Sequence, residues 1–197
     1  MKKLLIGSTN SGKVASYRSF LSHERITIVT PDDVGIHEEY REEGRSFEEI
    51  SRNKALFYAH LSNLPCIADD GGLEIDALND EPGIYSRRWP GYEASDIELV
   101  RYALKRMKNI PFERRGASLG GVITLAFPSG KCYHVEIAIR GIISEKLERP
   151  VAKGLPYRSL FWIPELSKYY TDLTPDELEQ RDHRKQGLDK LRVYLIS

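Results

Sequence analysis

The sequence predicts a mixed α/β fold, with a sheet and flanking helices bent into two lobes around a central groove. In the first half of the chain, short apolar runs alternate with stretches of helical periodicity, which is typical of strands joined by crossover helices. In the second half, strand-like runs are joined by tight turns, which is typical of hairpins. No repeat, low-complexity tract or Gly/Ser linker interrupts the chain, so residues 1–197 are predicted to form one domain.

The first elements are predicted as strand, polar loop, helix and strand. Residues 3–7 form an apolar run, and residues 14–21 place apolar side chains at helical spacing. Residues 26–30 are rich in β-branched side chains and are followed by Pro31, which favours a second strand that stops there. The polar residues 8–13 therefore lie between the first strand and the first helix.

A second helix and a short strand are predicted next. Ser46 and Glu49 form a capping box, which indicates a helix from there to about Ser62. Residues 65–68 form a short apolar strand that is expected to stop at two aspartates, and residues 73–77 alternate like a half-exposed strand. Two adjacent carboxylates are thus expected at the end of a strand.

The remaining elements follow the same rules of capping, alternation and turn chemistry. We expect a loop at 79–91, a helix from Ser95 to about Lys108, and a hairpin of 117–127 with 131–140, extended by 141–145. We also expect an irregular segment at 147–164, a helical turn at Thr174, and a final helix within 183–195.

Composition excludes several classes of protein. The 197 residues carry 29 Lys plus Arg and 29 Asp plus Glu, so the formal net charge is zero, which disfavours a nucleic-acid binder. No apolar run approaches the roughly 18 residues that a membrane span requires. The two cysteines, Cys66 and Cys132, form no CxxC pair, which disfavours a zinc site or a disulfide framework. A cytoplasmic protein without a membrane or nucleic-acid partner is expected.

Acidic residues are concentrated in two places. Residues 38–49 contain six acids against two arginines, and residues 69–81 contain six acids without any Lys or Arg. Such clusters occur on solvated loops or in sites for hard cations. Within the first cluster, Glu42 and Glu43 are candidate ligands for Mg²⁺, although by themselves they would be a solvated charge run.

The loop after the first strand is a candidate phosphate site. Hydroxyls, an amide and the free N–H groups of a helix start can bind phosphate oxygens, and Lys13 adds a positive charge. The spacing is not that of a P-loop, and an ordinary helix N-cap is the alternative interpretation. The candidates are Ser8, Thr9, Asn10 and Lys13.

Asp69-Asp70-Gly71-Gly72 is the candidate catalytic segment. Neighbouring carboxylates repel each other, which raises the pKa of one of them and suits it to act as a base. The glycines would let the backbone turn sharply and admit a ligand closely. A plain turn is the alternative, since Asp and Gly favour turns.

Three further features allow two interpretations each. Lys54 is either a second phosphate contact or a surface lysine, and His183-Arg184 either contacts a ligand or is exposed. The aromatic side chains in the late irregular segment could stack on a base or fill the core. These aromatics are Tyr157, Phe161 and Trp162.

Several motifs, in order along nearly the whole chain, resemble the inosine triphosphate pyrophosphatase family. Residues 8–13 are similar to its T-x-N-x-x-K loop, and residues 42–55 to its E-T-G-x-T-F-x-E-N-A-x-x-K-A segment. Residues 68–78 and 82–88 are close to A-D-D-S-G-L-E-V-D-A-L and P-G-x-Y-S-A-R. This central block carries the most specific part of the resemblance.

The resemblance implies an elongated two-lobed α/β fold, usually in a homodimer, that hydrolyses non-canonical purine nucleoside triphosphates such as ITP, dITP and XTP. The products would be the monophosphate and pyrophosphate, which cleanses the nucleotide pool. Mg²⁺ would be the cofactor, with Mn²⁺ a second option. The implied roles are Asp70 and Lys13 in catalysis, Glu42, Asp69 and Asp70 at the metal, and Ser8, Thr9, Asn10, Lys13, Lys54, Gly71, Gly154, Tyr157, His183 and Arg184 at the substrate.

The C-terminal base-recognition segment departs from the family pattern. Residues 154–161 correspond to G-F-G-Y-D-P-x-F, with Leu155 in place of the stacking Phe and Arg158 in place of the Asp. Leu178 replaces a lysine, Asp182 the serine of S-H-R, and Gly71 a serine. Two alternatives therefore stay open: the same chemistry on a pyrimidine or modified nucleotide, or a catalytically impaired nucleotide-binding protein.

Overall fold

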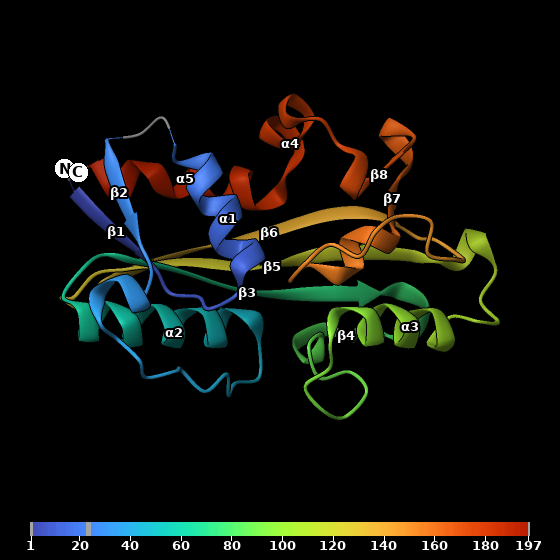
Figure 1. Cartoon of the computed structure of the whole chain (residues 1–197), viewed down its shortest axis with the longest axis horizontal. Helices are drawn as coiled ribbons and strands as arrows, with labels where there is room; N and C mark the ends of the chain where they lie inside the picture. Colours follow the sequence, from blue (N-terminus) through green and yellow to red (C-terminus); the bar gives the residue numbers. More distant parts are fainter. Residues whose placement is uncertain (1, 23–24, 197) are drawn as a thin grey trace. The chain divides into compact units, whose positions relative to one another are not determined.

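A computed structural model describes residues 2–22 and 25–196. In these residues the strands form an eight-stranded mixed sheet in the order β2-β1-β3-β5-β6-β7-β8, with β4 paired to β3 (Figure 1). The mixed α/β class predicted from the sequence is confirmed. The chain divides into two compact units, which are residues 1–70, 121–137 and 182–197 for unit 1, and residues 71–120 and 138–181 for unit 2. The single domain and the groove remain predictions.

Unit 1 contains a parallel βαβ arrangement. Strand β1 (Lys2–Ile6) pairs in parallel with β2 (Ile26–Val29) and with the beginning of β3 (Cys66–Ile75). Helix α1 (Ser11–Phe20) connects β1 to β2, and helix α2 (Phe47–Ser62) precedes β3. The last helix, α5 (His183–Ile196), returns to this unit.

Helices cover both faces of the unit 1 sheet, and the alternation of side chains along each strand decides which residues they cover. On one face, Leu4, Ile6 and Ile67 pack with side chains of α1 and α5. On the other face, Leu5, Cys66 and Ala68 pack with side chains of α2. Figure 1 shows α1 and α5 on the opposite side of the strands from α2.

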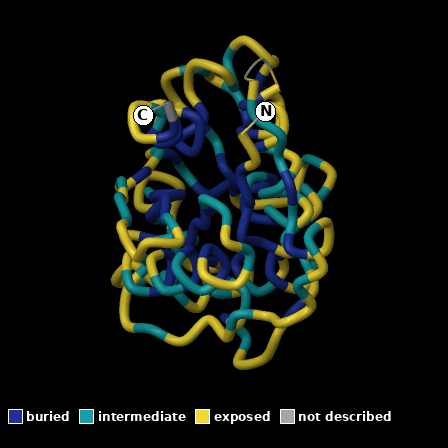
Figure 2. Tube along the Cα trace, turned by 90° about the vertical axis from the view of Figure 1, so that its left-hand side faces the viewer, coloured by how far each residue is buried: buried dark blue, intermediate teal, exposed yellow. Residues whose placement is uncertain are grey.

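Unit 2 is built around antiparallel strands. It contains β4 (Glu81–Pro82), β7 (Phe161–Ile163) and β8 (Lys168–Tyr169), together with parts of β5 (Gly116–Ala126) and β6 (Cys132–Ile143). Strand β7 pairs antiparallel with both β6 and β8. Helices α3 (Asp96–Arg106) and α4 (Pro175–Arg181) complete the unit. Side chains including Leu99, Phe161 and Tyr170 form its core, and buried stretches of the trace appear dark blue in Figure 2.

Most elements lie where the sequence predicts them, and three predictions are wrong. Strand β3 does not stop at Asp69 but continues through both aspartates and both glycines to Ile75. Gly72 permits this course, because a Cβ there would collide with the Ser86 hydroxyl and the Gly83 carbonyl. The irregular segment 147–164 contains β7, and the loop 79–91 contains β4; both strands are too short for a periodic signal.

Two further observations concern the cysteines and the helices. Cys66 and Cys132 are both free. Within residues 2–22 and 25–196, no helix is long and apolar enough to cross a membrane.

Candidate active site

The two adjacent aspartates lie on opposite faces of β3, because the strand continues through them. By this alternation, Asp69 shares the face of Ile67, which α1 and α5 cover, and Asp70 shares the face of Ala68, which α2 covers. Both are buried, at 1% and 7% exposed. The straight course of β3 therefore gives the two carboxylates different neighbours.

Asp69 lies between two cations. Its Oδ2 accepts a hydrogen bond from Arg184 Nε at 2.7 Å, and its Oδ1 lies 3.3 Å from Lys13 Nζ. Lys13 Nζ also donates to the Asp69 carbonyl oxygen at 3.1 Å. Burial alone would raise the pKa of Asp69, but Lys13 and Arg184 hold it well below its ordinary value. Asp69 is therefore an anionic anchor for Lys13.

Asp70 has a different electrostatic environment. Burial raises the pKa of this carboxyl to about 6, against the lowering effect of Lys13 and Lys54. Its Oδ2 is buried and has no hydrogen-bond partner among the described residues. A buried carboxylate with an open oxygen and a raised pKa has the properties of a general base.

Lys54 and Glu42 form a close ion pair on the α2 side. Lys54 Nζ donates to Glu42 Oε1 at 2.6 Å. Lys54 is almost fully buried, which by itself would lower its pKa, but Glu42 and Asp70 raise the pKa above its usual value. The amine is consequently held in its charged form. The structure thus makes Lys54 part of the buried cluster, and the alternative of a surface lysine is wrong.

The loop after β1 is an N-cap as well as a candidate phosphate site. Asn10 Oδ1 accepts from the backbone N–H groups of Gly12 and Lys13, at 2.9 and 3.2 Å, and Ser8 Oγ accepts from Asn10 N at 3.2 Å. The N-cap interpretation is confirmed, and phosphate binding by this loop stays a prediction; the cap directs α1 so that Lys13 reaches Asp69. Thr9 is exposed at the same loop.

His183 and Arg184 begin α5 and are both buried, so the interpretation as an exposed pair is wrong. Asp182 Oδ1 accepts from the backbone N–H groups of Arg184 and Lys185, at 2.8 and 3.2 Å, and thereby caps the helix. The acid that replaces the family serine therefore fixes the helix start that presents Arg184 to Asp69.

Gly71, Gly154 and Tyr157 belong to unit 2, and their substrate roles stay predictions. Gly154 N donates to Asp96 Oδ2 at 2.8 Å, and the Tyr157 hydroxyl donates to the Ser86 carbonyl at 2.7 Å. Burial raises the pKa of the Tyr157 phenol. These bonds hold the Gly154–Tyr157 segment in place within the unit.

The substituted side chains of the base-recognition segment have contacts of their own. The Arg158 guanidinium lies over the Tyr170 ring, 4.4 Å from its centroid, which is a cation–π geometry. Leu178 packs against the apolar core of unit 2, where a lysine would be costly to bury. Phe161 is also buried in this core, which fits the interpretation of this ring as a core residue.

A divalent cation fits only part of the predicted ligand set. Among the described residues no group of three His, Cys, Asp or Glu side chains converges. Asp70 Oδ2 has no hydrogen-bond partner among the described residues, Glu42 is paired with Lys54, and both oxygens of Asp69 face cations. Mg²⁺ commonly binds through one or two carboxylates plus substrate phosphates. The residues present therefore fit a cation that a triphosphate helps to hold.

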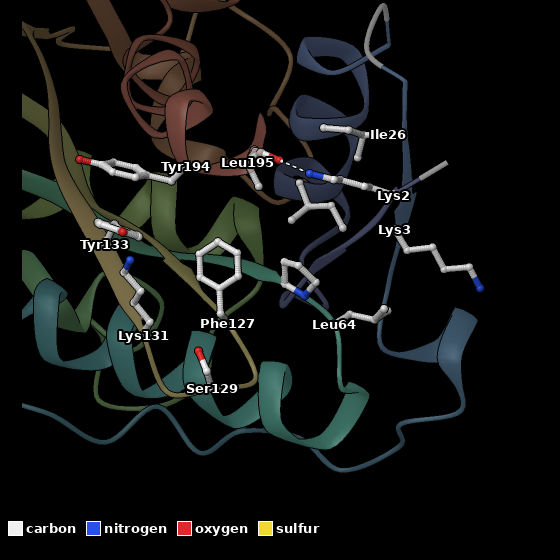
Figure 3. Close-up of a pocket in the computed structure, with 12 residues that line it drawn as sticks. Lys2, Lys3, Ile26, Leu64, Phe127, Ser129, Lys131, Tyr133, Tyr194 and Leu195 are labelled. Carbon is white, nitrogen blue, oxygen red and sulfur yellow. Dashed lines mark hydrogen bonds between the residues drawn. The ribbon is translucent and has the colours of Figure 1, made fainter. Parts of the chain in front are cut away.

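Two hollows formed by described residues of unit 1 differ in whether they adjoin the candidate site. One, of about 490 Å³, is lined by Ser8 and Thr9 together with residues of α1 and the segment after β2. The other, of about 550 Å³, is lined by none of the predicted site residues (Figure 3). There Lys2 Nζ donates to the Leu195 carbonyl at 3.4 Å and Lys131 lies over the Tyr133 ring. The second hollow is not part of the candidate site.

Sequence reasoning missed two features of the site. The pair of Arg184 with Asp69 joins residues 115 positions apart, and a single sequence gives no sign of such a pairing. The buried hydroxyls of Ser51 and Thr124 also escape notice, although polar residues inside apolar patterns on a predicted helix and strand are the signal that could have found them.

Comparison with known proteins identifies the family. The model of the Ham1 family matches residues 4–194. The chain belongs to the Ham1 family. A dITP/XTP pyrophosphatase of Clostridium perfringens is 33% identical over 201 residues, covering 99% of this chain and 98% of the relative. One from Thermus thermophilus is 35% identical over 190 residues, covering 96% of this chain and 89% of the relative.

Solved structures agree with this assignment. The HAM1 protein from Coxiella burnetii has a TM-score of 0.84 at 29% identity, covering 100% of this chain and 99% of that chain. The Ham1 protein of Staphylococcus aureus has a TM-score of 0.81 at 28% identity, covering 98% of each chain. The resemblance inferred from the motifs is confirmed.

Proposed function

We propose that this Ham1-family protein hydrolyses non-canonical purine nucleoside triphosphates, of the dITP, ITP and XTP type, to the monophosphate and pyrophosphate. The single observation that carries the proposal is the buried carboxylate of Asp70, with its open oxygen, beside the amines of Lys13 and Lys54. The names of its relatives give the substrate class, since those proteins are dITP/XTP pyrophosphatases.

The residues divide the chemistry among themselves. Lys13 and Lys54 bind phosphate oxygens and offset the negative charge that develops on them. Ser8, Thr9 and Asn10, before the N-terminus of α1, provide hydroxyl and side-chain amide groups to the same phosphates. Asp70 accepts the proton of the attacking water, which adds to the phosphorus atom at the α–β junction as pyrophosphate leaves.

A divalent cation, Mg²⁺ or Mn²⁺, would be held by Glu42 and Asp70 together with the substrate, and would polarise the phosphate oxygens. Asp69, the third metal ligand that the resemblance implies, lies against Lys13 and Arg184, and we propose that it holds Lys13 in place. His183 is proposed as a substrate contact beside this pair. Gly71, Gly154 and Tyr157 are proposed to meet the nucleoside.

A substrate panel tests the base preference. We expect kcat/KM for dITP, ITP and XTP to exceed that for dATP, dGTP and dUTP at least tenfold, with Asp70→Asn as the blank for contaminating activity. A preference for a pyrimidine or another modified nucleotide would support the alternative set by Leu155 and Arg158. Nucleotide binding without turnover would support the other alternative, a catalytically impaired nucleotide-binding protein.

The remaining assignments come from the resemblance and the charge balance. We propose a homodimer, as the resemblance implies, in the cytoplasm and without a membrane partner. We propose no nucleic-acid partner, because the net charge is zero.

A further inference from the structure

Two buried hydroxyls lie behind the candidate catalytic carboxylate. Ser51 on α2 and Thr124 on β5 are both 0% exposed. Ser51 Oγ lies 3.2 Å from the Ala68 carbonyl oxygen and 2.8 Å from Thr124 Oγ1. All three residues belong to unit 1, so the contacts lie within one compact body.

The number of hydroxyl hydrogens limits how this chain of bonds can run. Ser51 has one hydroxyl hydrogen, so it donates to only one of its two neighbours. If Thr124 donates to Ser51 and Ser51 donates to Ala68, both hydroxyls and the second lone pair of the carbonyl are satisfied. A buried hydroxyl pair is costly unless it is satisfied in this way.

These hydrogen bonds lie next to the segments that carry the candidate catalytic residues. Ala68 directly precedes Asp69 and Asp70 in β3, and by alternation it shares the α2 face with Asp70. Ser51 lies one turn before Lys54 on α2, so both side chains leave the helix on the same side. The Ser51 hydroxyl is therefore a polar link between the helix that carries Lys54 and the strand that carries Asp70.

We propose that Ser51 is a positioning residue. Its hydrogen bond to the Ala68 carbonyl sets the separation of the Lys54 amine from the Asp70 carboxylate. Thr124 donates a hydrogen bond to the Ser51 hydroxyl. The inference rests on the proposed function for its kinetic consequence. A displacement of about 1 Å in a reacting group can lower a rate by about a hundredfold, because attack requires close alignment.

Three variants test the role. Ser51→Ala should lower kcat at least tenfold with KM changed less than twofold, because binding groups remain while their alignment with Asp70 is lost. Thr124→Val leaves the Ser51 to Ala68 bond in place and should keep kcat within about threefold. Ile123→Val removes one buried methylene from the same strand and should leave kcat unchanged, which controls for loss of packing.

Amide hydrogen exchange separates this inference from the proposed function. Ser51→Ala should speed exchange at the amides of residues 69–71 at least tenfold relative to Ile123→Val, whether or not the protein turns over nucleotides. If wild-type protein hydrolyses no triphosphate, the proposed function fails, and exchange alone decides the positioning role. Unchanged exchange at 69–71, or a wild-type kcat in Ser51→Ala, would overturn it.

Discussion

Replacing Asp70 by asparagine is expected to lower kcat for triphosphate hydrolysis by about 10²- to 10⁴-fold, the usual contribution of a general base. The amide has nearly the same shape as the carboxyl but cannot accept the proton of water. Steady-state pyrophosphate release measures the effect. Asp80→Asn is a matched control, since Asp80 is exposed and its left-handed backbone tolerates asparagine. Activity of Asp70→Asn within tenfold of wild type would remove Asp70 from its role.

The stability of the same variant would show whether its fold is intact. Because burial raises the folded-state pKa of Asp70 from 3.8 to about 6, the ionised carboxylate destabilises the fold. The favourable contribution of the protonated Asp70 carboxyl to the free energy of unfolding is complete below pH 3.8 and is lost as the pH rises through 6. In metal-free buffer, Asp70→Asn should therefore be more stable than wild type at pH 8, by about 3 kcal/mol, and equal to it near pH 4. Urea unfolding measures this difference.

Arg184→Met should destabilise the protein by about 3–5 kcal/mol, because it removes one member of a buried ion pair. The side chains of Arg184 and Asp69 are 6% and 1% exposed, so little water could replace the lost bond. Urea unfolding at neutral pH gives the free energy. The charge of Asp69 would then rest on Lys13 alone, and Lys13 would be less available to the substrate.

An exposed pair provides the comparison. Arg181 lies 3.4 Å from Glu165, and their side chains are 50% and 77% exposed. Arg181→Met should cost less than about 1 kcal/mol, as exposed ion pairs usually do. A loss below 1 kcal/mol in Arg184→Met as well would show that the Asp69 pair is not a buried anchor.

The sequence allowed much of unit 1 to be predicted, because its signals are local. Asn10 and Ser46 cap the starts of α1 and α2 in the structure, and apolar runs form β1 and β2. The course of β3 could not be predicted in this way. Asp-Gly pairs favour turns, but here the neighbouring segment at Gly83–Ser86 requires Gly72 for close approach within an uninterrupted strand.

The candidate site could be predicted in its residue types but not in its pairings. The sequence motifs indicated Lys13, Lys54, Glu42 and the two aspartates. From the sequence we expected the two aspartates to form one cluster, because they are neighbours along the chain. The strand separates them, so that Asp69 meets Lys13 and Arg184 while Asp70 keeps an open oxygen. Such pairings depend on side-chain direction and on contacts across the chain, which one sequence does not contain.

The most direct test of the central claim measures the products of dITP or XTP hydrolysis with Mg²⁺ present, with pyrophosphate and orthophosphate quantified separately. Attack at the α–β junction predicts one pyrophosphate and one nucleoside monophosphate per substrate, with no orthophosphate, and loss of both products in Asp70→Asn. Release of orthophosphate with a nucleoside diphosphate would contradict the account, because it would place the attack at the γ-phosphate.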